Sequence, residues 1–145
     1  MRLPKPDPGL VVSYDYLWRY EERLGRDGGR KTRPCAIVVS VTDENGESVV
    51  MVAPITHARP EDPDTAIPLP PRVKRHLGLD DQPSWIIADE VNRFVWPGPD
   101  LRPVSPKSKS KFEYGILPVD IFDRLRRRIL ALNKERRLRI VTRSE

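Results

Sequence analysis

The sequence is poor in the residues that crosslink small domains or bind metals. It has one cysteine, Cys35, and two histidines, His57 and His76. One cysteine cannot form an internal disulfide, and together these three residues do not supply the four ligands of a structural zinc site. Because apolar residues follow Cys35 directly, we interpret it as a small hydrophobic residue of a buried strand. We expect no metal and no other cofactor.

Long hydrophobic runs are also missing. No stretch approaches the roughly 20 consecutive apolar residues that a transmembrane helix needs. Residues 1–8 lack the apolar segment of a secretory signal. These absences predict a cytoplasmic protein that does not associate with membranes. A length of 145 residues fits one domain, so we expect a single domain over residues 1–145.

The sequence lacks several familiar enzyme signatures. It contains no glycine-rich phosphate loop ending in Gly-Lys-Ser/Thr, no Gly-x-Ser-x-Gly elbow and no His-Glu-x-x-His motif. The sequence therefore does not favour nucleotide binding, serine hydrolysis or zinc-dependent hydrolysis.

Proline and basic residues are abundant instead. The 16 prolines predict short strands joined by stiff loops, because proline lacks the N–H that helices and sheets use. The net charge of +5 makes a polyanion a reasonable partner. Residues 120–145 carry nine bases and four acids, so this part accounts for the whole positive excess.

The order of predicted elements indicates a mainly β (α+β) fold. Strands are expected at residues 9–14, 33–41, 48–55, 65–69, 84–88, 91–96 and 138–142. A short helix is expected from Pro70 to Leu77, and a longer one over residues 118–133, where apolar residues recur at helical spacing. This order predicts a small β-barrel or strongly curved sheet with a helix packed on it.

Two segments between these elements are predicted to lie outside regular structure. Residues 15–32 are interpreted as a long charged loop with glycine hinges. Residues 55–59 lie between Pro54 and Pro60, so we expect them to leave the sheet as a short exposed segment.

A predicted hairpin brings several polar residues together. The Asp43-Glu44-Asn45-Gly46 turn places Arg33 and Thr56 at the same end of two paired strands, with His57 next to Thr56. A guanidinium beside a hydroxyl and an imidazole can stabilise a phosphorane and move a proton. The alternative is an arginine protecting a strand edge, an ordinary strand threonine and a solvated loop histidine.

Several motifs in this order resemble the PemK/MazF family of toxins from type II toxin–antitoxin modules. The matching residues are Pro8-Gly9-x-Val11-Val12, Arg33-Pro34 before the apolar run at 36–40, and Pro54-Ile55-Thr56-His57. Ser84-Trp85-Ile86-Ile87, Asp89-Glu90-x-Asn92 and Phe94-x-Trp96-Pro97-Gly98 resemble its longer PemK-like growth-inhibitor branch.

The resemblance implies an SH3-like β-barrel with a C-terminal helix, a homodimer and a ribosome-independent endoribonuclease. Such an enzyme cuts single-stranded RNA without a metal. The substrate's own 2′-hydroxyl attacks the adjacent phosphate, which leaves a 2′,3′-cyclic phosphate and a 5′-hydroxyl. A cognate antitoxin would cover the RNA groove.

The resemblance also implies roles for individual residues. Arg33 would stabilise the transition state and can protonate the leaving oxygen, and Thr56 would hydrogen-bond the scissile phosphate. His57 is either an accessory proton-transfer group or a structural loop residue. The candidates for RNA binding are Arg30, Lys31, Glu90, Asn92 and Trp96.

One departure from the family pattern affects the arginine assignment. The family commonly shows Gly-x-Arg-Pro, whereas two extra residues separate Gly29 from Arg33-Pro34 here. Arg30 could therefore share or take over the phosphate role. Trp96 could stack an RNA base or lie in the core or a dimer interface. Arg126, Arg127 and Arg128 could follow a phosphate backbone or form a solvated or antitoxin-facing side of the helix.

Two other functions remain open on sequence grounds. One is inhibition of a topoisomerase, as in the CcdB-like toxins, and the other is a non-catalytic SH3-like module that binds RNA or protein. Arg33-Pro34 together with Pro54-x-Thr56 favours the nuclease.

Overall fold

The structure is a computed structural model that describes residues 3–26 and 31–143. The strands are β1 (Leu10–Asp15), β2 (Thr32–Thr42), β3 (Ser48–Thr56), β4 (Ala66–Pro68), β5 (Trp85–Ile87), β6 (Glu90–Val95), β7 (Glu113–Ile116) and β8 (Arg139–Thr142). The helices are α1 (Arg19–Arg23), α2 (Pro71–His76) and α3 (Val119–Lys134), with a 3-10 turn at Pro63–Thr65. Within the described ranges, no helix is long and apolar enough to cross a membrane.

The predicted β2–β3 hairpin is confirmed as the centre of the sheet. Asp43 stabilises its turn by accepting hydrogen bonds from the N–H groups of Asn45 and Glu47, both at 2.9 Å. The sheet runs in the order β4-β5-β3-β2-β1-β7, and β6 pairs with both β3 and β8. All pairings are antiparallel except β6 with β8. This arrangement places the ends of β2 and β3 beside β5.

The prediction that residues 55–59 leave the sheet is wrong for the first two of them. Ile55 and Thr56 continue β3 and pair with β5, and Ile55 is buried. Proline is tolerated at position 54 because β3 changes partners there: it pairs with β6 up to Val52 and with β5 from Ile55. The missing N–H of Pro54 therefore falls between the two partner strands.

Side chains on the two faces of the sheet form two apolar clusters, as the period of two in β-strands requires. One face buries residues such as Val11 and Ala36 against α3. The other face buries residues such as Tyr14 and Cys35. Cys35 is fully buried, in agreement with its predicted role in a buried strand.

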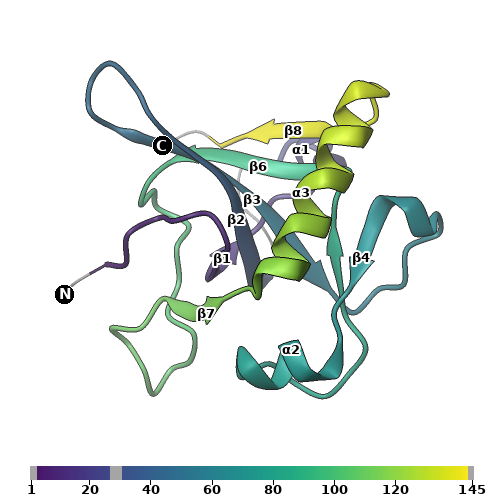
Figure 1. The fold of residues 1–145 in the computed structure, drawn as a ribbon. Helices are drawn as coiled ribbons and strands as arrows, with labels where there is room; N and C mark the ends of the chain where they lie inside the picture. The colour runs from purple at the N-terminus through teal and green to yellow at the C-terminus, as the bar shows by residue number, and fades with distance from the viewer. Residues whose placement is uncertain (1–2, 27–30, 144–145) are drawn as a thin grey trace.

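Helix α3 lies across one face of the sheet, and α2 lies near one end of it (Figure 1). The predicted C-terminal helix is confirmed, with the four buried side chains Ile121, Leu125, Ile129 and Leu132 at helical spacing. The mainly β fold is also confirmed. The expected barrel is not closed by hydrogen-bonded pairing in the described part of the chain, because β4 and β7 end the path of paired strands.

Two short elements differ from the sequence prediction. Part of the predicted 15–32 loop is the helix α1, where buried Glu21 accepts a hydrogen bond from the Trp18 N–H at 3.1 Å. Strand β7 was not predicted, because it has four residues and includes Gly115, whose φ is +141°. This strand places Tyr114 on the wall of a pocket at the open end of the β2–β3 hairpin.

Candidate active site

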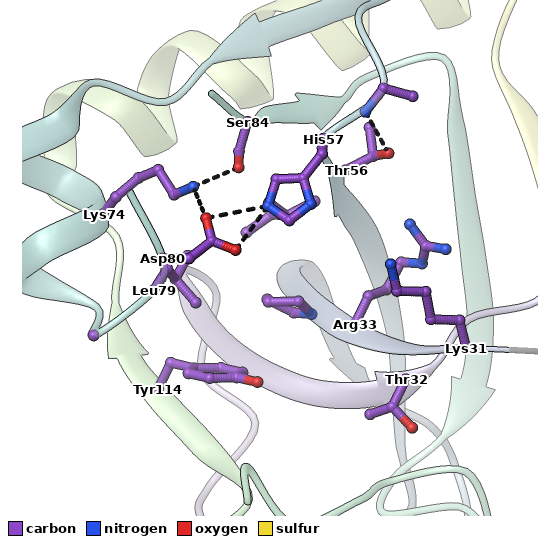
Figure 2. Close-up of a pocket in the computed structure, with 14 residues that line it drawn as sticks. Lys31, Thr32, Arg33, Thr56, His57, Lys74, Leu79, Asp80, Ser84 and Tyr114 are labelled. Carbon is purple, nitrogen blue, oxygen red and sulfur yellow. Dashed lines mark hydrogen bonds and ion pairs between the residues drawn. The ribbon is translucent and has the colours of Figure 1, made fainter. Parts of the chain in front are cut away.

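A pocket of ≈ 510 Å³ opens where β2 begins and β3 ends. Four of the residues proposed from the sequence line it: Lys31, Arg33, Thr56 and His57. Figure 2 shows the arginine and lysine on one side, with Lys74 and Asp80 on the other. The pocket therefore joins the open end of the hairpin to the helix α2 region.

Arg33 and Thr56 meet because of the strand register. Cys35 pairs with Pro54 in the β2–β3 ladder, so two further residues along each strand bring Arg33 opposite Thr56. Both residues are half-buried and both line the pocket. The predicted proximity of these two side chains is confirmed.

The Arg33 guanidinium is held by an aromatic ring. Its central carbon lies 5.2 Å from the centre of the Trp18 ring, within the range of a cation–π contact. Within the described residues, its buried Nε has no hydrogen-bond partner and no carboxylate lies within ion-pair distance of it. Arg33 lines the pocket, so its positive charge is available to an anion that binds there.

The Thr56 hydroxyl is oriented by the backbone that follows it. The Ala58 N–H donates a hydrogen bond to Thr56 Oγ1 at 3.1 Å. This contact uses a lone pair of the oxygen and leaves the O–H free to donate. Thr56 can therefore donate a hydrogen bond to an anion that Arg33 binds.

His57 is fixed at one of its two ring nitrogens. Its Nε2 lies 2.8 Å from Asp80 Oδ2 and 3.1 Å from Asp80 Oδ1. In Figure 2 the other ring nitrogen, Nδ1, is on the side of the ring away from Asp80. Nδ1 is therefore the nitrogen available for a ligand in the pocket.

Asp80 is fixed in turn by a buried lysine. Lys74 Nζ donates to Asp80 Oδ1 and to Ser84 Oγ, each at 2.6 Å, and to the Gln82 carbonyl oxygen. The Gln82 N–H also donates to Asp80 Oδ1, at 3.1 Å. The hydrogen bond from Lys74, supported by those from His57 and Gln82, lowers the pKa of Asp80 to about 2. Asp80 is therefore an anion at neutral pH.

Four residues of the pocket were not predicted from the sequence: Lys74, Asp80, Ser84 and Tyr114. One signal was present for Lys74, which lies next to Val73 and three residues before Leu77 on the apolar side of a predicted helix. A lysine at such a position either extends to solvent or needs buried acceptors. Its acceptors come from the loop after α2, and that contact could not be read from local sequence.

Asn92 lies outside the pocket, inside the protein. It is fully buried, and its side chain bonds both backbone groups of Leu17: the N–H at 2.9 Å and the carbonyl oxygen at 2.8 Å. Arg143 also donates to Asn92 Oδ1, at 3.2 Å. Asn92 therefore has a structural role: its hydrogen bonds fix the loop that carries Trp18.

Glu90 supports the same loop. Its Oε2 accepts hydrogen bonds from the Tyr16 hydroxyl at 2.9 Å and from the Arg19 N–H at 3.2 Å. Burial raises the pKa of Glu90 to about 7, against the opposing effect of these two donors. Glu90 does not line the pocket.

Trp96 lies far from the pocket. The Trp96 N–H donates to Ser48 O at the first residue of β3, whereas Thr56 is the last residue of that strand. Eight residues of extended strand separate the two ends by about 26 Å. Trp96 stacks on Phe94 with ring centres 6.3 Å apart. Arg30 lies outside the described residues.

The three arginines at 126–128 are engaged within the molecule. Arg126 and Arg127 form ion pairs with Asp123 at 3.7 and 3.0 Å, and Arg128 bonds Asp64 at 2.9 and 3.3 Å. All three are partly or well exposed on α3. They form a mostly paired surface, separate from the pocket.

A second hollow of ≈ 400 Å³ shares Arg33 and Thr56 with the pocket. Trp18, Tyr20 and Arg59 line it together with these two residues. Arg33 and Thr56 therefore line both hollows, and the second has aromatic walls. In residues 3–26 and 31–143, no group of three or more His, Cys, Asp or Glu side chains is placed to hold a metal ion.

The arrangement can bind an anion and move a proton. Arg33 and Lys31 supply positive charge, Thr56 supplies a hydroxyl donor, and His57 supplies Nδ1 of a ring whose Nε2 is held by an anionic carboxylate. These are the groups that stabilise a pentavalent phosphorus and assist attack by a hydroxyl.

One comparison with known proteins identifies the family. The model of the PemK-like, MazF-like toxins of type II toxin–antitoxin systems matches residues 8–94. The matched region contains Arg33, Thr56, His57, Lys74 and Asp80. No curated protein matches the chain.

Proposed function

As the chain belongs to the PemK-like, MazF-like toxin family of type II toxin–antitoxin systems, we propose that it is a metal-independent endoribonuclease that cuts single-stranded messenger RNA. The observation that carries this proposal is the pairing of Arg33 with Thr56 in one pocket. Within the described residues, no carboxylate pairs with that guanidinium, so its charge is available to a scissile phosphate.

In the proposed reaction the 2′-oxygen attacks the adjacent phosphorus, and the bond from phosphorus to the 5′-oxygen breaks. His57 Nδ1 accepts the proton of the 2′-hydroxyl. Arg33 and Thr56 hydrogen-bond the non-bridging phosphate oxygens, whose negative charge increases in the transition state. The leaving 5′-oxygen takes a proton from the Arg33 guanidinium or from solvent that it binds. The products are a 2′,3′-cyclic phosphate and a 5′-hydroxyl.

We propose that RNA runs past Arg33 and Thr56, with one flanking nucleotide in each of the two hollows that these residues line. Lys31 lines the same pocket and can bind a neighbouring phosphate. The hollow with Trp18 and Tyr20 offers aromatic rings for base stacking.

Family membership implies a cognate antitoxin. We propose that the antitoxin covers this RNA surface and that the toxin is a cytoplasmic homodimer. Exposed apolar side chains such as Ile116 and Val119, which are 56% and 84% exposed, support an interface with another chain. Sedimentation of the purified protein alone tests the homodimer. Sedimentation together with the antitoxin tests the toxin–antitoxin complex.

The direct test of the function is incubation of the purified protein with a mixed-sequence RNA in EDTA. We expect new ends that carry a cyclic phosphate. Thr56→Val should lower the cleavage rate by about tenfold or more, because it removes a hydrogen bond to a charged oxygen at nearly constant volume. Thr56→Ser keeps the hydroxyl and is the matched control.

The alternative functions make different predictions in the same experiment. Intact RNA together with stalled gyrase cleavage complexes on plasmid DNA would favour topoisomerase inhibition. RNA binding that weakens steeply with salt but never yields product would favour a non-catalytic binding module.

A further inference from the structure

A chain of polar contacts leads from the candidate proton acceptor into the protein interior. It runs from His57 Nε2 to Asp80 at 2.8 Å, and from Asp80 to Lys74 Nζ at 2.6 Å. His57 and Asp80 are about half exposed, whereas the Lys74 side chain is only 5% exposed. The chain therefore has a half-exposed pair at the surface and a buried cation beneath it.

The Lys74 ammonium is fully satisfied, which makes it a rigid anchor. An ammonium has three N–H donors. Lys74 uses them for the Asp80 carboxylate, the Ser84 hydroxyl and the Gln82 carbonyl oxygen. These acceptors all lie in the segment 80–84, so Lys74 ties the loop between α2 and β5 to the helix.

Asp80 is held on both carboxylate oxygens. Oδ1 accepts from Lys74 Nζ and from the Gln82 N–H, and Oδ2 lies against His57 Nε2. With an anion at this position, Nε2 carries a proton in the neutral ring. The lone pair then lies on Nδ1.

We propose that Asp80 and Lys74 are positioning residues for the ribonuclease reaction, which hold His57 in the tautomer and orientation that accept the 2′-hydroxyl proton. This inference rests on the proposed ribonuclease function. Asp80 also stabilises the imidazolium that forms when His57 takes the proton, and Lys74 keeps Asp80 from turning toward solvent. Neither residue contacts the reacting atoms.

The test is a double-mutant cycle on the full-length protein with a single-stranded RNA substrate. His57→Gln should lower kcat by about 100-fold, and Asp80→Asn by about tenfold with little change in KM. In the His57→Gln background, Asp80→Asn should change kcat by less than about twofold, because its effect passes through His57. Asp81→Asn alters the exposed neighbouring carboxylate and should leave kcat unchanged.

The split between kcat and KM separates positioning from a general structural effect. The charged and titratable groups that share the pocket with His57 are Asp80, Lys74, Lys31, Arg33 and Tyr114. Asp80→Asn should lower kcat with little change in KM, because Arg33, Lys31 and Thr56 still meet the RNA while His57 loses its fixed orientation. Lys74→Met should imitate Asp80→Asn in both kcat and KM. If the Lys74→Met variant does not fold, Asp80→Asn still tests the inference, because the Asp80 side chain is about half exposed and its replacement should leave the protein folded.

The outcomes separate this inference from the proposed function. If the wild-type protein leaves RNA intact, the function fails and the inference falls with it. If the wild type cuts RNA but Asp80→Asn lowers kcat by the same factor in the wild-type and His57→Gln backgrounds, the function stands and the positioning role is overturned. A raised KM with an unchanged kcat in Asp80→Asn would overturn it as well. Coupled effects on kcat with an unchanged KM would support it.

Discussion

The Arg33 guanidinium lies 5.2 Å from the centre of the Trp18 ring. This contact joins the first residues of β2 to the loop that follows β1. Glu21 accepts a hydrogen bond from the Trp18 N–H, and Asn92 bonds the backbone of Leu17 on its other side. The loop therefore supports the side chain proposed to stabilise the transition state.

Replacing Trp18 should weaken catalysis through Arg33. A partly desolvated cation–π contact is worth about 1 kcal/mol, so Trp18→Leu should lower kcat about fivefold. Trp18→Phe keeps an aromatic face and should retain most of the rate. Single-turnover cleavage of a labelled RNA measures both. Equal rates for the leucine variant and the wild type would show that the ring does not act on Arg33.

Arg33 itself should tolerate neither alanine nor lysine. The planar guanidinium binds two phosphate oxygens at once, which an ammonium cannot do. We expect both variants to lower kcat by about 10²- to 10³-fold, the usual loss for a group that stabilises developing charge. Arg124→Ala, an exposed arginine on α3, is the matched control for net charge. A lysine variant with near wild-type activity would exclude bidentate binding.

Stability should fall as pH rises through the titration of Glu90. Its pKa is about 7 in the folded protein and ordinarily 4.5, because burial disfavours the carboxylate. Its stabilising contribution is therefore complete below pH 4.5 and is lost as pH rises toward 7, by roughly 1.4 kcal/mol per pH unit. Glu90→Gln should gain stability relative to wild type over this interval.

Urea unfolding at pH 4.5, 6 and 8 checks this prediction. Asp80 does not disturb the window, since its lowered pKa of about 2 places its own contribution at more acidic pH. Asp89, whose pKa is also raised by burial, is present in both proteins and cancels. A difference between variant and wild type that stays constant from pH 4.5 to 8 would contradict the assignment.

Asn92→Ala should destabilise the fold. It leaves the N–H and carbonyl of Leu17 without their side-chain partner in a buried place, at a cost of about 3 kcal/mol. In a chain of this size that corresponds to a fall in Tm of roughly 10 °C. Asn133→Ala, at an exposed position on α3, is the control. A wild-type Tm for Asn92→Ala would argue against a structural role for these hydrogen bonds.

The part of the site that lies on the β2–β3 hairpin could be predicted from the sequence, because it depends on local geometry. A hairpin with a clear turn fixes which residues meet at its open end, so Arg33 and Thr56 could be paired in advance. Lys74 and Asp80 could not, because their contact with His57 depends on how α2 and its following loop pack against the sheet. That packing is tertiary, and no period or motif in the sequence reports it.

The errors in the fold have similar physical causes. Residues 19–23 form a helix without apolar periodicity, stabilised by the buried Glu21. Ile55 stays in the sheet because β5 replaces β6 as the partner of β3 just beyond Pro54. Both outcomes depend on tertiary contacts that outweigh local propensity.

The central claim is that the 2′-hydroxyl of the RNA attacks the adjacent phosphate while that phosphate is bound by Arg33 and Thr56, and so cleaves the RNA. Once a cleaved bond has been mapped, the same RNA is made with a single 2′-deoxy nucleotide on the 5′ side of that bond. Incubated with the wild-type protein in EDTA, the unmodified RNA should yield a 2′,3′-cyclic phosphate, and the modified RNA should stay intact at that position. Cleavage of the modified bond at an undiminished rate would contradict the account.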